Sequence, residues 1–121
     1  MGDWDQATLA TIDHAGEIHL AAYRPDGTLR PATIVWHVVL DGAVFVRSVR
    51  GEEGAWYRAA RRTGTGTVRV GSAHAEVTFT PDDTHDTAID RAYHAKYGNG
   101  SPVRAITSAE ATATTLRLDP R

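Results

Sequence analysis

The chain has 121 residues, of which 41% are hydrophobic and 23% charged, with a net charge of −2. This length and composition suit one globular domain, so we expect a single domain over residues 1–121. Cysteine is absent, which excludes disulfides, thiol nucleophiles and thiolate metal sites. No apolar run approaches the roughly 20 residues of a membrane span, and no charged, apolar leader opens the chain. A cytoplasmic protein without a membrane partner is therefore expected.

Positive charge is concentrated between residues 47 and 69, where six arginines stand against Glu52 and Glu53. The remainder of the chain is acidic on balance. A nucleic-acid-binding protein is usually basic overall and carries a broad positive patch. The compact cluster instead favours a small anionic ligand, so we expect a small-molecule partner and no nucleic acid.

The first half of the chain predicts a helix followed by three strands. Apolar spacing and an aspartate cap indicate the helix at residues 3–14, within an N-terminal segment of residues 1–16. The three strands are expected at residues 17–23, 29–40 and 43–49. Pro25-Asp26-Gly27 and Asp41-Gly42 are turn signals between them. Apolar residues on both faces of the 29–40 stretch predict that this strand is central.

The second half predicts two further helices and three further strands. The first of these helices follows Gly54, and an acidic stretch that begins at Pro81 opens the second. The expected strands are at residues 67–70, 73–80 and 111–118, and a loop is expected at 98–102. The complete order predicts a mainly β fold with flanking helices, in which six mostly antiparallel strands close into a small barrel over residues 17–118.

One segment carries the strongest signal for a ligand. Arg47, Ser48 and Arg50 end the third expected strand, and a helix follows them. Guanidinium groups, a hydroxyl and the free N–H groups of a helix start can together bind an anion. Because Arg47 and Ser48 lie on opposite faces of a strand, Arg50, which follows the strand, is better placed than they are. The segment predicts a site for a phosphate-bearing ligand.

Residues 21–36, with an Arg-Pro-Asp-Gly turn at 24–27, resemble the opening hairpin of the FMN-binding split barrels, the pyridoxamine-phosphate-oxidase-like superfamily. Residues 44–48 and 92–98 are similar to other recurring pieces of these proteins. More narrowly, residues 47–58 resemble a small bacterial family of unknown function within that superfamily. The resemblance extends over residues 17–118. It implies a six-stranded antiparallel split β-barrel and a homodimer, since the cofactor in this superfamily usually sits in a groove between two subunits.

The resemblance also implies a bound flavin, FMN or a deazaflavin, and an oxidoreductase that transfers hydride or electrons to a small molecule. The implied cofactor contacts are Thr33, Ile34 and Val35 beside the ring, Trp56 stacked near it, and Arg47, Ser48, Arg50 and Arg58 at the phosphate. Many members place a basic residue early in the helix, where this chain reads Ala55-Trp56-Tyr57. More of the expected phosphate binding therefore falls to Arg50 and Arg58.

These residues also have purely structural interpretations. The arginines could pair with Glu52, Glu53 and Glu76 on a solvated surface, residues 33–35 could be an ordinary core strand, and Trp56 could fill the core. The alternative function is a cofactor-free barrel that binds a small anion. A third possibility is a barrel with a structural or partner-binding role.

Metal and hydrolase chemistry find little support in the sequence. None of the six histidines has the i, i+4 spacing of a helical zinc site, and the acidic residues after Pro81 suit a helix start. We therefore predict no metal site. Ser48 lacks the Gly-x-Ser-x-Gly setting of a hydrolase nucleophile. His37, in the expected central strand, is the histidine to test as a proton donor, and no catalytic residue is assigned.

Overall fold

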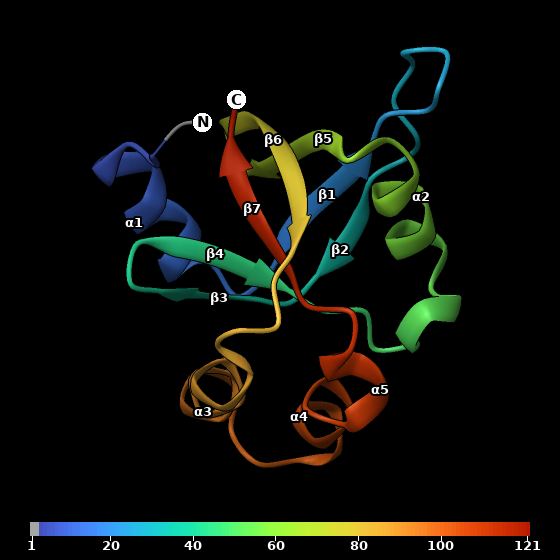
Figure 1. The fold of residues 1–121 in the computed structure, drawn as a ribbon. Coiled ribbons are helices and arrows are strands. Elements are labelled where there is room, and N and C mark those ends of the chain that lie inside the picture. The colour runs from blue at the N-terminus through green and yellow to red at the C-terminus, as the bar shows by residue number, and fades with distance from the viewer. Residues whose placement is uncertain (1–2) are drawn as a thin grey trace.

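The computed structural model describes residues 3–121 as a curled β-sheet with helices around it (Figure 1). In chain order the elements are α1 (Gln6–His14), β1 (Ile18–Ala22), β2 (Thr33–Val35), β3 (His37–Leu40), β4 (Ala43–Val46), the 3-10 turn η1 (Gly51–Glu53), α2 (Ala55–Thr63), β5 (Thr65–Val70), β6 (Ala73–Pro81), α3 (Asp86–Tyr97), α4 (Ser101–Ile106), α5 (Ala109–Thr112) and β7 (Leu116–Pro120). Among these residues, no helix has the length and apolar character needed to cross a membrane.

The seven strands form one sheet in the order β2-β1-β5-β6-β7-β4-β3, and all neighbouring strands are antiparallel. The two outermost strands, β2 and β3, are consecutive in the chain and are separated only by Trp36. Since the two ends of the sheet meet at this residue, the sheet curls into a nearly closed barrel. The predicted class, a mainly β antiparallel barrel with flanking helices, is confirmed.

The predicted strand at 29–40 is wrong as a single central strand. Thr33–Val35 pairs with β1, where Val35 lies opposite Ile18, whereas His37–Leu40 pairs with β4, where His37 lies opposite Val46. Both faces are apolar because the segment changes its sheet partner at Trp36. Both pieces are outermost in the sheet order, and their separation gives seven strands where six were expected.

The predicted strand at 111–118 is wrong in its first half. The chain there forms α5, whose first turn is capped by the Ser108 hydroxyl, which accepts a hydrogen bond from the Ala111 N–H at 3.2 Å. The strand β7 begins only at Leu116. The alternating alanines and threonines of this stretch fit a strand by pattern, but the serine cap starts a helical turn. The expected loop at 98–102 is also shorter, because α4 begins at Ser101.

Two local signals are confirmed. Asp5 caps α1, its carboxylate accepting from the Thr8 N–H at 3.0 Å. Asp41 and Gly42 both have positive φ, 51° and 80°, as a type I′ hairpin turn requires between β3 and β4. The aspartate tolerates this conformation better than most residues.

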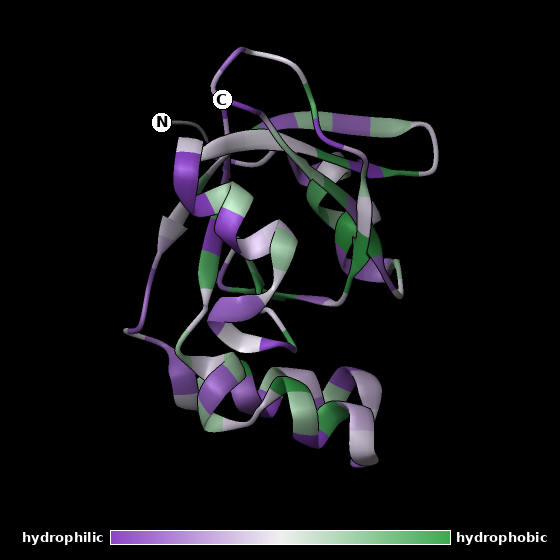
Figure 2. Cartoon of the chain, turned by 90° about the vertical axis from the view of Figure 1, so that its right-hand side faces the viewer, coloured by the Kyte–Doolittle hydropathy of each residue, from purple (hydrophilic) through white to green (hydrophobic). Residues whose placement is uncertain are grey.

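Alternation along β4 gives the molecule two apolar cores. Val44 and Val46 face the barrel interior, whereas Phe45 packs with Ile89 and Tyr93 of α3 in a second cluster. In Figure 1, α3, α4 and α5 lie together below the barrel. In Figure 2, which looks onto the α2 side, hydrophobic and hydrophilic segments alternate along the helices, as expected for helices with one packed face and one solvated face. The strand therefore separates the barrel from a helical layer.

His37 connects the barrel to two helices. Its buried Nε2 lies 2.5 Å from the Ile12 carbonyl oxygen of α1 and 3.1 Å from Lys96 Nζ of α3. Its Nδ1 has no hydrogen-bond partner among the described residues. Desolvation disfavours the charged ring and lowers the pKa of His37 to about 4. The residue is therefore a neutral internal anchor, and it lines neither of the clefts described below.

Acidification is expected to destabilise the fold through His37. Its pKa falls from 6.5 to about 4 on folding, so between these values the unfolded chain binds a proton that the folded chain does not. The stabilisation is complete above pH 6.5 and is lost as the pH falls toward 4, a total on the order of 3 kcal/mol. Urea unfolding at pH 7 and pH 4.5 measures this loss of stability. The loss between the two pH values should be smaller in His37→Gln than in the wild type. An unchanged pH dependence in the variant would assign the effect to other groups.

Candidate functional site

A cleft lies beside the end of β4, bordered by β2, the start of α2, and α4. It has a volume of about 440 Å³, within the range of small-molecule sites in proteins. We call it the main cleft. Most of the cofactor contacts expected from the sequence line it, and these are Thr33, Ile34, Val35, Arg47, Ser48, Arg50 and Trp56. The structure therefore brings together seven of the eight expected contacts, and Arg58 lies outside this cleft.

The walls of the main cleft are apolar. Trp36 and Trp56 line it from two sides, and Pro102, Ala105 and Ile106 line it from α4. Trp36 is held in place by Tyr97, whose ring stacks on it with centroids 4.0 Å apart and an interplanar angle of 8°. The sequence indicated no role for α4, because the residues that this helix places at the cleft are apolar. Such walls suit a flat, apolar ring.

One end of the main cleft has groups that can accept an anion. Gly54 is the N-cap of α2, and no side chain in residues 3–121 caps it, so the first N–H groups of this helix remain available. A Cβ atom at Gly54 would lie 2.2 Å from the Ser48 hydroxyl oxygen. Only glycine therefore allows Ser48 to approach the helix start this closely. Gly51, with φ of 66°, makes the turn that carries the chain from β4 to this helix.

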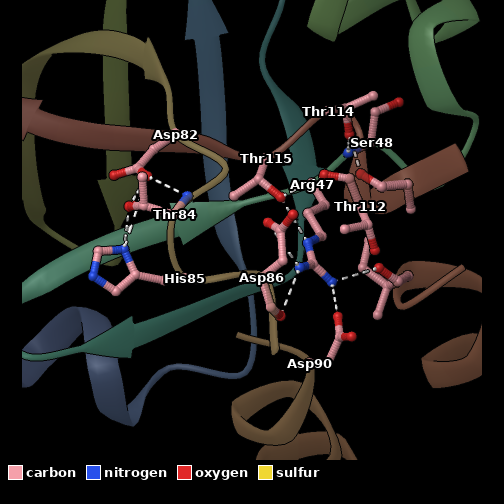
Figure 3. Close-up of polar contacts among 12 residues, drawn as sticks. Arg47, Ser48, Asp82, Thr84, His85, Asp86, Asp90, Thr112, Thr114 and Thr115 are labelled. Carbon is pink, nitrogen blue, oxygen red and sulfur yellow. Dashed lines mark hydrogen bonds and ion pairs between the residues drawn. The ribbon is translucent and has the colours of Figure 1, made fainter. Parts of the chain in front are cut away.

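The guanidinium of Arg47 is buried and bonded to other parts of the protein. Figure 3 shows its guanidinium surrounded by acceptors from the helical layer and from Thr115, which directly precedes β7. Nε donates to Thr115 Oγ1 at 2.9 Å, and Nη1 donates to Asp90 Oδ1 at 2.5 Å and to the Ile106 carbonyl at 3.3 Å. Nη2 donates to the Asp86 carbonyl at 3.3 Å. The side chain is fully buried, so this geometry assigns the guanidinium to the fold rather than to a ligand.

Strand alternation explains why the side chains of neighbouring residues point in different directions. Arg47 follows Phe45 by two positions and points with it toward α3, whereas Ser48 points the other way. The Ser48 N–H donates to Thr114 Oγ1 at 2.8 Å, which fixes the strand end at the cleft. Arg50 lies beyond the strand and is exposed at the cleft. Arg50 is thus the arginine of this segment that can meet a ligand.

The ion pairs expected in the structural interpretation of the arginines are not formed. Among the described residues, neither Arg50 nor Arg58 has a carboxylate within ion-pairing distance, and the pairs found involve Arg47, His85 and Arg117. Glu76 instead accepts from the Tyr23 hydroxyl at 2.7 Å. Arg58 lines a second cleft of about 460 Å³ between α2 and the β1–β2 connection. The described residues contain no cluster of His, Asp or Glu that could hold a metal ion.

Comparison with known structures identifies the fold. The chain has the split-barrel fold of the pyridoxamine-phosphate-oxidase-like proteins, as the sequence resemblance implied. HutZ, the heme storage protein from Vibrio cholerae, matches with a TM-score of 0.66 and 10% identity over 99% of this chain and 92% of that chain. An F420 reductase matches with a TM-score of 0.57 and 17% identity over 98% of this chain and 96% of that one.

A Listeria innocua protein provisionally assigned as a pyridoxamine 5'-phosphate oxidase matches with a TM-score of 0.57 and 15% identity, over 93% of this chain and 87% of that chain. Residues 8–118 match the family described as uncharacterized protein conserved in bacteria (DUF2255), so the chain belongs to that family. A search of curated protein sequences gives no match.

Arg47 and Arg50 should respond oppositely to substitution. Arg47→Met leaves Asp90 and Thr115 without their partner and should lower the free energy of unfolding by roughly 3 kcal/mol, the low end for a broken buried pair, because Asp90 is partly exposed to water. Arg50→Met removes an exposed side chain and should change the free energy of unfolding by less than about 0.5 kcal/mol. Urea unfolding of both variants measures the difference, and equal stabilities would contradict the assignment of Arg47 to the fold.

Proposed function

We propose that the protein binds a flavin, FMN or a deazaflavin, in the main cleft and acts as an oxidoreductase on a small molecule. The observation that carries this proposal is the form of the cleft, whose apolar walls end at Ser48, Arg50 and an uncapped helix start. A flavin has the same two parts, a flat ring and an anionic tail. The likeness in fold to an F420 reductase is consistent with this proposal.

The backbone of β2 would hold the ring edge. In the described sheet β2 pairs only with β1, so its other edge has backbone N–H and C=O groups available to ring heteroatoms. Thr33, Ile34 and Val35 line the cleft along this edge, and Trp56 offers a ring at the start of α2. Arg50, the Ser48 hydroxyl and the first N–H groups of α2 would bind the phosphate. A bound flavin supplies two-electron redox chemistry, while these residues orient it.

The donor set of the main cleft favours flavin over haem. Haem iron in proteins is held by histidine, cysteine, methionine or tyrosine side chains. None of these residue types lines the main cleft within the described chain. His37, the most deeply buried histidine, is turned toward Ile12 and Lys96 instead. The heme storage named for HutZ is therefore not proposed for this protein.

Titration with FMN tests the proposal. We expect quenching of flavin fluorescence and a rise in melting temperature, and Arg50→Ala should weaken binding at least about tenfold through loss of a charge-assisted hydrogen bond. Gly54→Ala should also weaken it, because the added Cβ meets Ser48. Gly16→Ala is the matched control, since a Cβ there has no neighbour within 4 Å in the described part of the chain. Absence of any FMN effect would contradict the proposal, and stabilisation by inorganic phosphate alone would support the cofactor-free anion-binding barrel.

We also propose that the protein is a homodimer. Ile34 and Val49 are both 53% exposed, and both line the main cleft. Large aliphatic side chains at the margin of an open cleft leave apolar surface that a second copy would cover. The dimer expected from the family resemblance would place this margin between subunits.

Sedimentation of the purified protein should give a dimer, and Ile34→Glu should shift it toward monomer, because a charge would be buried at the interface. Ala95→Glu, which adds the same charge on an exposed position of α3, should leave the dimer intact. A monomeric wild-type protein at high concentration would contradict the proposal.

A further inference from the structure

The second cleft is strongly cationic. It lies between α2 and the long connection from β1 to β2, which are neighbours at one side of the barrel (Figure 1). Its volume is about 460 Å³, and four arginines line it, which are Arg24, Arg30, Arg58 and Arg62. The other lining residues are Tyr23, Pro25, Ala55 and Ala59, so no carboxylate of residues 3–121 belongs to the lining. We call it the arginine cleft.

These guanidinium groups have few protein partners. Arg24 Nη1 donates to the Leu29 carbonyl at 3.0 Å and to Thr28 Oγ1 at 3.3 Å, which holds the connection against itself. Within residues 3–121, the side chains of Arg30, Arg58 and Arg62 make no hydrogen bond or ion pair. Like charges gathered without an acceptor repel one another, and an anion placed among them removes this repulsion.

The arginine cleft continues from the anion-binding end of the main cleft. Ala55, the first residue of α2, lines both. From there Ala55, Arg58, Ala59 and Arg62 follow the i, i+3, i+4, i+7 spacing of one helix face, a length of about 10 Å. Arg61 lies off this face and donates to the Tyr57 hydroxyl at 2.9 Å. A row of cations therefore leads away from the point where the first phosphate would bind.

We propose that the arginine cleft binds an anionic chain, so the natural ligand is a polyanion that carries several phosphate or carboxylate groups beyond the first phosphate. This inference rests on the proposed function, because the ring and first phosphate of the ligand occupy the main cleft. Arg58 and Arg62 contact the chain from α2, and Arg30 contacts it from the β1–β2 connection. Plain FMN, with one phosphate, fills only the main cleft.

Calorimetric titration with inorganic tripolyphosphate and with citrate tests the site separately from flavin binding. We expect at least one of these probes to bind, and the preferred probe distinguishes a phosphate chain from a carboxylate chain. Arg58→Ala and Arg62→Ala should each weaken that binding at least about tenfold. Both residues are exposed, so these variants should keep the melting temperature of the wild type.

Arg61→Ala is the matched control, since it removes the same charge from the same helix but not from the cleft. If it weakens the binding as much as Arg62→Ala does, or if neither probe binds, the inference is overturned. The result also separates the two proposals. If a probe binds in a way that depends on Arg62 but FMN does not bind, the flavin proposal is contradicted and the arginine cleft remains an anion site. If FMN binds but neither probe does, the flavin proposal stands and the proposed anion site in the arginine cleft is contradicted.

Discussion

The hydrogen-bonded ion pair between Arg47 and Asp90 is the interaction on which the rest of the site depends. It joins the end of β4 to α3, and the same guanidinium also holds α4 through the Ile106 carbonyl and β7 through Thr115, which directly precedes that strand. A buried arginine carries a large desolvation cost that only a full set of acceptors offsets. With Arg47 fixed in this way, the next residues turn outward at a defined place, and α4 becomes a wall of the main cleft.

The barrel class follows from local signals in the sequence. Alternation and the turn residues at Asp41 and Gly42 are sufficient for it, because they act within a few residues. The division at Trp36 is different, since a strand pattern records which faces are apolar and not which strand is the partner. The roles of Arg47 and Arg50 could not be separated by residue type alone. Arg47 lies on the strand face that points toward α3, whereas Arg50 follows the strand. Arg47 also has Asp90 as a partner, which lies far along the sequence and is brought close only by the fold.

The two clefts share one electrostatic design. Helix α2 begins without a side-chain cap beside Ser48 and Arg50, and its exposed face carries arginines that meet no carboxylate among the described residues. Each of these features costs stability, and a bound anion would offset that cost. Gly54 also leaves the helix less stable than it could be. A capping serine or aspartate at this position would stabilise the helix but would collide with Ser48. The surroundings of α2 thus suit the proposed anionic ligand better than they suit the stability of the helix itself.

Amide chemical-shift mapping during an FMN titration tests the central claim most directly, because it locates the ligand without altering a residue. If FMN binds in the main cleft, the largest shifts should fall on the backbone amides of residues 33–35 and 54–56, which line it. The amides of α3, which faces the second apolar core, should move little. Largest shifts on α3, or on strands β5 and β6 away from both clefts, would contradict the assignment of the main cleft as the flavin site.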